Sequence, residues 1–129
     1  MHAVEEVCVT IDERQRGDVV VLDLHGKITG GDRLIIETID ALVTRGACRV
    51  VLNFADVSYM DSVGLSTIVR SHLRLRQQEG QLVLLHLPQR IADLLSVTGL
   101  TKVFQPFDDE SAAIRSCGSP IRPAAGAGE

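Results

Sequence analysis

The sequence is poor in aromatic residues and in runs of positive charge. It has no tryptophan and one tyrosine among 129 residues, and aromatic residues make up 3% of the chain. A protein that binds single strands needs stacking platforms, and one that binds duplexes needs a cationic surface. The net charge of −4 and the absence of a dense Lys/Arg run therefore argue against a nucleic acid partner.

Cysteine is also scarce. Cys8, Cys48 and Cys117 are odd in number and far apart, so they predict neither a disulfide framework nor a metal site. We expect free thiols in a reducing cytoplasm. The first ten residues lack the basic and apolar regions of a signal peptide. No apolar run approaches the ~20 residues of a membrane span, so we expect no membrane insertion.

What the sequence does have is a series of Val-, Leu- and Ile-rich runs, with 45% hydrophobic residues overall. Runs that read as strands alternate with amphipathic stretches that read as helices. The pattern predicts strands near residues 4–14, 19–24, 49–54, 81–87 and 102–108. It predicts helices near residues 32–45, 62–79, 89–98 and 110–117, the first capped by Asp32 and the second burying Leu65, Ile68, Val69 and Leu73.

This order indicates one α/β domain. The first two strands are joined by a short polar link, which favours an antiparallel pair at the edge of the sheet. The strand–helix–strand units that follow favour parallel pairs. We therefore expect a mixed, mostly parallel sheet with an antiparallel edge strand, covered by about four helices. The domain should span residues 1–117, and the Gly/Pro/Ala-rich residues 118–129 should form a disordered tail.

The joint between the third strand and the second helix reads Met60-Asp61-Ser62-Val63-Gly64-Leu65. Function in α/β sheets tends to lie where strands end and helices begin. Asp61 and Ser62 have a simple interpretation as helix-capping residues. The alternative is that Ser62 is phosphorylated, because a helix amino terminus tolerates a phosphoryl group and the added charge would repel a fitted partner.

No enzyme site is recognisable. Met60 stands two residues before Ser62, where a nucleophile elbow needs glycine. His25, His72 and His86 have no setting typical of a general base, and the last two read as histidines at the edge of the core. The chain has neither the glycine spacing of a phosphate-binding loop nor a metal-binding motif, so we expect no cofactor.

The stretch "VVLNFADVSYMDSVGLSTIV" resembles the signature of the STAS domain, in particular that of the stand-alone anti-sigma factor antagonists of bacteria. Such proteins show D-S-[ST]-G-L opening a helix after an apolar strand. "VVVLDLHGKI" resembles the second strand of that family, and residues 79–114 resemble its C-terminal half. The resemblance covers about Val4 to Arg115 and implies the STAS fold.

The resemblance also implies a function without catalysis. In that family the serine after the motif aspartate, here Ser62, is phosphorylated by an anti-sigma factor, a serine kinase of the GHKL type. The unphosphorylated antagonist binds this kinase, which then releases its sigma factor. Phosphorylation blocks the binding, and a phosphoserine phosphatase resets the switch. The binding face implied here comprises Ser58, Tyr59, Met60, Asp61, Ser62, Val63, Gly64 and Thr29.

Two positions depart from the family pattern. Val63 stands where the family usually has Ser or Thr, and Thr29 stands where many relatives have Asp. Tyr59 and Met60 could anchor a partner or pack beneath the loop. A second hypothesis is a structural STAS subunit of a lipid-transport ATPase or stressosome-like complex, in which Ser62 only caps the helix.

Overall fold

The computed structural model describes residues 9–29, 33–104 and 106–118. Five strands form one sheet, and their order in space is their order in sequence. The strands are β1 (Thr10–Arg16), β2 (Val19–Ile28), β3 (Arg49–Met60), β4 (Gln81–Leu85) and β5 (Pro106–Phe107). The helices are α1 (Leu34–Thr44), α2 (Ser62–Arg76), α3 (Gln89–Thr98) and α4 (Glu110–Gly118), with a 3₁₀ turn, η2, at Leu100–Lys102.

The predicted mixed sheet is confirmed. β1 pairs antiparallel with β2, from Thr10 opposite His25 to Arg16 opposite Val19. β2 with β3, β3 with β4, and β4 with β5 all pair in parallel. Each parallel pair needs a crossover, and α1, α2 and the α3–η2 segment supply these in turn.

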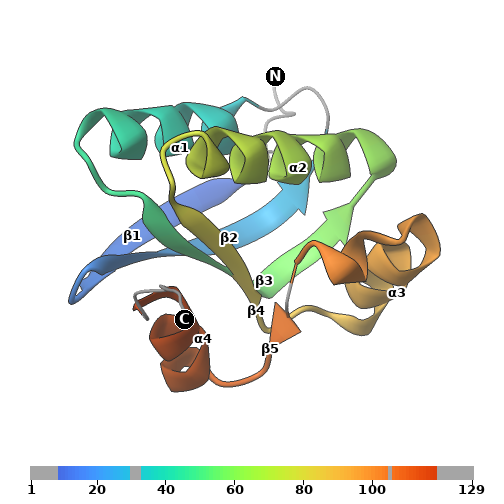
Figure 1. Cartoon of the computed structure of the whole chain (residues 1–129). Helices are drawn as coiled ribbons and strands as arrows, with labels where there is room; N and C mark the ends of the chain where they lie inside the picture. The colour runs from blue at the N-terminus through green and yellow to red at the C-terminus, as the bar shows by residue number, and fades with distance from the viewer. Residues whose placement is uncertain (1–8, 30–32, 105, 119–129) are drawn as a thin grey trace.

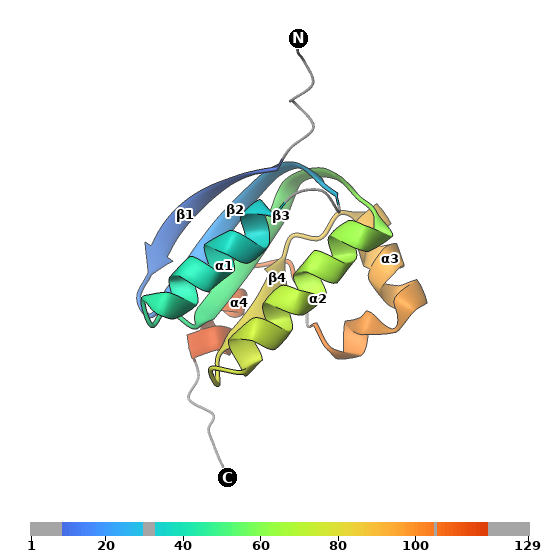
Figure 2. The ribbon, with the colours of Figure 1, turned by 90° about the horizontal axis from the view of Figure 1, so that it is seen from above.

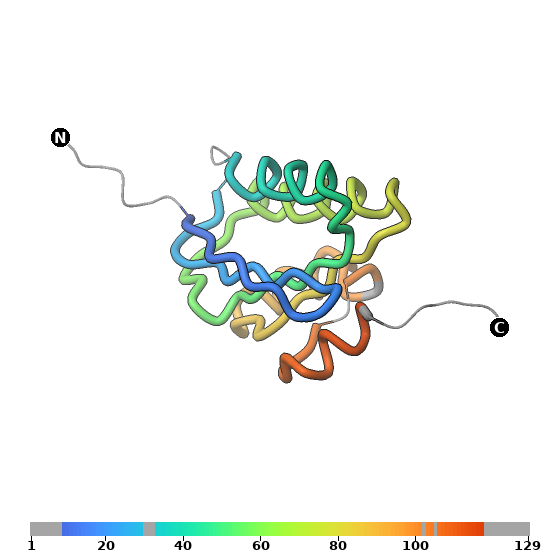
Figure 3. The backbone as a smooth tube through the Cα atoms, turned by 90° about the vertical axis from the view of Figure 1, so that its left-hand side faces the viewer, coloured from blue at the N-terminus to red at the C-terminus, as the bar shows by residue number. Residues whose placement is uncertain are grey.

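The helices form layers on the two faces of the sheet (Figure 1). α1 and α2 lie side by side across one face, as the view from above shows (Figure 2). α3 lies beyond α2, while α4 packs against the opposite face (Figures 1 and 3). The sheet is therefore the middle layer, and strand residues must be apolar on both of its faces where helices cover them.

The alternation of side chains along β2 divides them between two cores. Val20, Leu22 and Leu24 belong to the large core beneath α1, α2 and α3. Val19 and Val21 point the other way, to a smaller core with Ala113 and Cys117 of α4. This division explains why the strand reads as a continuous apolar run rather than an alternating one.

β3 is longer than the sequence pattern indicated. The prediction ended this strand near Phe54 and placed Ser58–Met60 in a loop, but β3 continues to Met60. Beyond Asn53 it has no partner in β4 and pairs only with β2, with register shifts near His25 and Lys27. These irregularities bury every third residue, Phe54, Val57 and Met60, so the period-2 signal of a strand is lost.

Two predictions about the second helix and the third interior strand are also corrected. Leu73 is not in the buried stripe of α2, because 54% of it is exposed and Leu75 is buried instead. At 3.6 residues per turn, Leu73 lies roughly 140° around the helix from Ile68, whereas Leu75 lies almost above it. His86 lies outside β4 in the left-handed region, with φ 57°, and its N–H donates to the Phe107 carbonyl.

Several predictions fall outside the described residues. These are the strand before Thr10, Cys8, the Asp32 cap and the tail after residue 118. Within the described chain, Cys48 and Cys117 are free thiols, as predicted. Burial raises the pKa of Cys117 to about 12, so this thiol stays protonated near neutral pH.

Candidate functional site

β2 and β3 extend beyond the rest of the sheet, and the connection from β3 to α2, which contains Ser62, lies at the end of this extension. The paired ends are Ile28 and Met60. The Asp61 N–H reaches the Ile28 carbonyl at 3.4 Å, and α2 begins at the next residue. Thr29 follows Ile28 directly and is half-buried. The structure thus brings Thr29 beside the Asp61-Ser62 turn, although 32 residues separate Thr29 from Asp61 in the chain.

Asp61, and not Ser62, caps α2. Asp61 has extended backbone angles, and its Oδ1 accepts a hydrogen bond from the Gly64 N–H at 2.6 Å. Its carbonyl accepts the N–H of Leu65 at 2.9 Å, the first bond of the helix. This is the geometry of an N-cap residue, whose removal typically costs ~1 kcal/mol. The capping role that the sequence left open between the two residues therefore belongs to Asp61.

Gly64 is the place where α2 comes closest to β2. A Cβ at this position would lie 2.2 Å from the carbonyl oxygen of Ile28. No side chain fits that distance, because the obstacle is backbone and cannot rotate away. Glycine in the motif therefore sets how closely the first turn of α2 sits on the strand end, and with it the height of Ser62 above the sheet.

Ser62 is the first residue of α2 and is exposed. Its hydroxyl makes no hydrogen bond to any described residue, whereas its carbonyl accepts one from Ser66 Oγ at 3.3 Å. The amino terminus of a helix leaves backbone N–H groups without internal partners and carries a partial positive charge. A hydroxyl at this position is free to react, and an anion attached to it would lie in a favourable field.

The residues around Ser62 divide into exposed and buried ones. Val63 and Tyr59 are 59% and 41% exposed, although both are hydrophobic, and Ser58 is exposed. Met60 is 8% exposed, and Gly64 is buried. Of the predicted binding residues, Val63, Tyr59, Ser58 and Ser62 can therefore form the outer surface, while Met60 and Gly64 support it from beneath.

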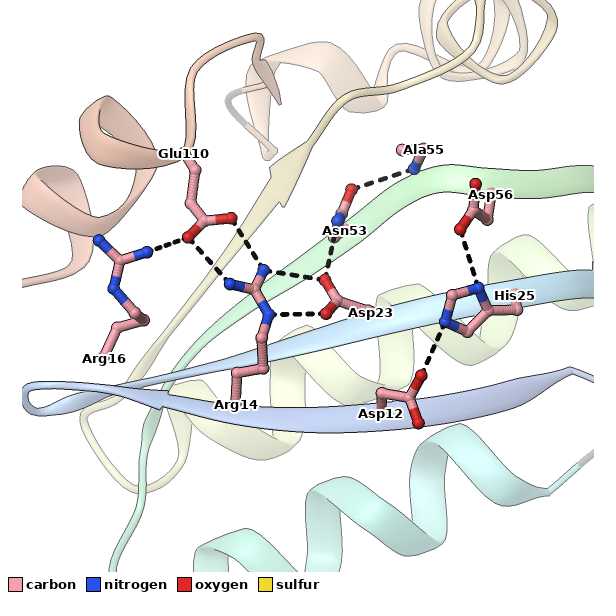
Figure 4. A network of polar contacts seen from close by, with 9 residues as sticks. All are labelled: Asp12, Arg14, Arg16, Asp23, His25, Asn53, Ala55, Asp56 and Glu110. Carbon is pink, nitrogen blue, oxygen red and sulfur yellow. Dashed lines mark hydrogen bonds and ion pairs between the residues drawn. The ribbon is translucent and has the colours of Figure 1, made fainter.

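A second polar cluster lies on the face of the sheet that α4 covers in part (Figure 4). The guanidinium of Arg14 binds both carboxylate oxygens of Asp23, at 2.7 and 3.0 Å, and both of Glu110. Arg16 also pairs with Glu110, and Asn53 donates to Asp23 at 2.8 Å. The hydrogen bonds from Arg14 lower the pKa of Asp23 and that of Glu110. This cluster fastens α4 to β1 and β2.

None of the described histidines forms a hydrogen bond with the Ser62 hydroxyl. His25 lies between Asp12 and Asp56, with ring nitrogens 3.0 and 2.9 Å from their carboxylates (Figure 4). His72 stacks edge-on against Phe104, and its Nδ1 is buried without a partner. The described residues also contain no group of three His, Cys, Asp or Glu side chains arranged for a metal ion.

A polar pocket of about 450 Å³ lies at the other end of the parallel strands, where β2 and β3 begin and α2 ends. Its lining residues are Asp18, Gly46, Cys48, Arg49, Gln78 and Glu79. Ligands of open α/β sheets bind beyond the carboxyl ends of strands, so this pocket lies at the less favourable end. Among the described helices, none is long and apolar enough to cross a membrane.

The comparison with known proteins agrees with this geometry. The family model of the STAS domain matches residues 10–113. The chain belongs to the STAS domain family. The anti-sigma-B factor antagonist of Bacillus subtilis is 31% identical over 97 residues, which cover 74% of this chain and 87% of that protein. These matches confirm the resemblance that the motif around Ser62 indicated.

Solved structures confirm the fold. An anti-sigma factor antagonist from Mycobacterium paratuberculosis superposes with a TM-score of 0.75 at 19% identity, covering 92% of this chain and all of that one. The Bacillus cell fate determinant SpoIIAA in its phosphorylated form superposes with a TM-score of 0.66 at 22% identity, covering 83% of this chain and 99% of that one. At these identities the likeness concerns the architecture, a single α/β domain with a SpoIIAA-like fold.

Sequence reasoning missed two contributors to the site. It did not find the backbone carbonyl of Ile28, which holds Asp61 and limits residue 64. The glycine of the motif was the available signal for that close approach. It also missed the Arg14 cluster, whose signal was the charged residues at alternate positions of β1 and in β2.

Proposed function

We propose that this protein is an anti-sigma factor antagonist that works by partner switching. In this proposal the unphosphorylated protein binds an anti-sigma factor, a serine kinase of the GHKL type, in the bacterial cytoplasm, and so frees a sigma factor. The kinase transfers the γ-phosphoryl group of ATP to Ser62 Oγ; the bond to ADP breaks, and the hydroxyl proton leaves to the kinase. The phosphorylated protein no longer binds, and a phosphoserine phosphatase restores it. The protein itself catalyses nothing.

The observation that carries this proposal is the division of labour between Asp61 and Ser62. Because Asp61 caps α2, the Ser62 hydroxyl forms no hydrogen bond with a described residue that its modification would break. It is exposed on the first turn, beside the hydrophobic surface of Val63 and Tyr59. A neutral hydroxyl next to exposed apolar groups suits a contact that a dianion would abolish.

The known relatives support the same proposal. The curated protein from Bacillus subtilis is named as an antagonist of an anti-sigma factor, and the SpoIIAA structure is of a phosphorylated form. The departure at Val63 removes one hydroxyl beside Ser62 and leaves Ser62 itself unchanged. We therefore expect Val63 to affect the rate of phosphorylation more than its site.

The test is the intact mass of the protein after incubation with ATP and each candidate GHKL-type kinase from the same genome. We expect the wild type to gain the mass of one phosphoryl group with one kinase. Ser62→Ala should gain none, because the acceptor oxygen is absent. Ser96→Ala and Ser111→Ala are matched controls, since both remove an exposed serine hydroxyl outside the proposed binding face and should gain the group as the wild type does.

Other outcomes would redirect the proposal. If no kinase modifies the protein but one binds it tightly, the protein is an antagonist without a phosphorylation switch. If no kinase either modifies or binds it, the proposal is wrong, and a structural STAS subunit becomes the better hypothesis. Phosphorylation of Ser62→Ala would place the acceptor elsewhere.

A further inference from the structure

The outward face of α2 continues the surface of Ser62 along the helix. Ser62, Ser66 and Leu73 are four and seven residues apart, so they fall within roughly 40° of one another around the axis. Val63 and Arg70 are also seven apart and lie next to this line. We call these five residues the outer stripe of α2. Its length from Ser62 to Leu73 is roughly 16 Å.

The outer stripe is uncovered. No other described element passes over α2 in the view from above (Figure 2). Val63 and Leu73 are 59% and 54% exposed, and Ser62, Ser66 and Arg70 are exposed too. Large hydrophobic side chains so exposed on one helix face contribute nothing to the core, which Leu65, Ile68 and Leu75 build from the opposite side.

The charge of the stripe is also unbalanced. α2 contains three arginines and no acidic residue in its 15 positions. Arg74 pairs with Asp40 of α1 at 2.9 Å. Arg70, by contrast, forms no ion pair with any described residue. It lies between Val63 and Leu73 along the length of the stripe. A free guanidinium between exposed apolar groups is complementary to a carboxylate at the edge of an apolar surface.

A stable interface buries more surface area than the turn at Ser62 can supply. Specific protein complexes bury about 800 Å² on each partner. One helical turn with a serine and a valine supplies only part of this area. The outer stripe adds exposed apolar surface that is continuous with the turn.

We propose that the outer stripe of α2 is a docking surface for the anti-sigma factor, whose contacting surface carries an apolar recess for Leu73 and an acidic group for Arg70. This inference rests on the proposed function and extends it from the switch residue to the surface that provides affinity. Val63 and Ser62 lie at one end of the contact, where phosphorylation acts. Leu73 and Arg70 lie beyond the reach of the phosphoryl group and contribute whenever the partner is bound.

The test measures binding by titration calorimetry, using the kinase that wild-type protein binds in the intact-mass experiment. We expect Leu73→Asp and Arg70→Glu each to weaken binding at least tenfold, and Leu73→Ala at least threefold. Raising the salt concentration should weaken the wild type more than Arg70→Glu, because the ion pair is screened. Val97→Asp and Arg45→Glu make the same chemical changes elsewhere, since Val97 is exposed on α3 and Arg45 pairs with Glu13 of β1. Both should bind within twofold of the wild type.

The outcomes separate the two proposals. If wild type binds a kinase and both stripe variants bind as tightly, the docking surface is wrong while the proposed function stands. If the controls weaken binding as much as the stripe variants, the effect is not local to α2 and the inference also fails. If wild type binds no kinase, both proposals fall together. Circular dichroism of each variant checks that the helix content is unchanged.

Discussion

Two polar regions of this protein differ in whether their charged and hydrogen-bonding side chains find partners within the described chain. In the cluster on the α4 face, Arg14, Asp23, Glu110 and Asn53 bind one another, and each charge meets an opposite one within the chain (Figure 4). On the outer stripe of α2, the Ser62 hydroxyl and the Arg70 guanidinium have no described partner. The first region is complete in the isolated protein, and the second is not.

The difference separates structure from interaction. A cluster that satisfies itself gains little from another molecule, because any new contact must replace a bond that already exists. The Arg70 guanidinium and the Ser62 hydroxyl, which pair with no described residue, give up only contacts with water when a partner covers them, and the partner's polar groups can replace these contacts. Both regions contain an arginine, so the presence of a cation alone would not have told them apart.

The largest effect is expected from a substitution in the outer stripe of α2. Ser62→Asp places a negative charge on the first turn of α2, where we propose that the neutral hydroxyl meets the kinase. We expect binding to weaken about 100-fold, which is about 2.7 kcal/mol. Titration calorimetry measures it, and Ser66→Asp, one turn along, should weaken binding less. Undiminished binding of Ser62→Asp would contradict the switch.

Gly64→Ala tests the support beneath that region. The new Cβ would lie 2.2 Å from the Ile28 carbonyl, so α2 must shift away from β2. Overpacking of this kind costs about 2 kcal/mol. Urea unfolding at pH 7 measures the loss, and Ser66→Ala in the same helix should change stability by less than about 0.5 kcal/mol. A stability equal to that of the wild type would show that the turn adjusts freely.

Much of this fold could be predicted because its strands and helices follow simple periods. The continuous apolar runs of β2, β3 and β4 and the glycine after α1 predicted a covered parallel sheet, and the polar link before Val19 predicted the antiparallel edge. The Asp-Ser-x-Gly motif predicted where the candidate site lies. These features depend on local patterns, which a sequence shows directly.

What could not be predicted depends on contacts between distant residues. The end of β3 looked like a loop because its register shifts against β2 bury every third residue. Leu73 looked buried because it is hydrophobic, although the helix turns it outward. The capping role was ambiguous because Asp61 and Ser62 are both good caps, and only the bond to Gly64 decides between them. The charged residues of β1 and β2 indicated a polar face, but only the fold brings Arg14 to Glu110, which is 96 residues away.

A smaller effect is expected from a substitution in the Arg14 cluster on the α4 face. Arg14→Ala leaves Asp23 and Glu110 without their main cation, at a half-exposed position where solvent screens the charges. We expect a loss of about 1 kcal/mol in the free energy of unfolding at pH 7, against almost none for Arg45→Ala, which breaks one exposed pair. Kinase binding should be unchanged in both, because neither lies on the outer stripe.

The pH dependence of Arg14→Ala sharpens the same point. Arg14 lowers the pKa of Asp23 and Glu110, so the folded state holds their protons less tightly than the unfolded chain does. Their contribution is present above the unfolded pKa of about 4 and is lost as pH falls below it. Urea unfolding at pH 7 and pH 3.5 should show the stability difference between wild type and Arg14→Ala shrinking at the lower pH. A difference that stays constant would mean that Arg14 acts through packing.

The smallest effect concerns His72, a polar side chain inside the fold that lacks a hydrogen-bond partner. Its Nδ1 is buried without a partner against Phe104, and burial lowers its pKa. The unfolded chain therefore binds a proton below about pH 6.5 that the folded protein resists, so stability falls as pH drops from there toward the folded pKa. We expect the loss between pH 7.5 and pH 6 to be below about 1 kcal/mol. His72→Leu should flatten this slope in thermal unfolding, because it removes the titrating ring and keeps an apolar contact with Phe104. An unchanged slope in His72→Leu would assign the pH dependence to other groups.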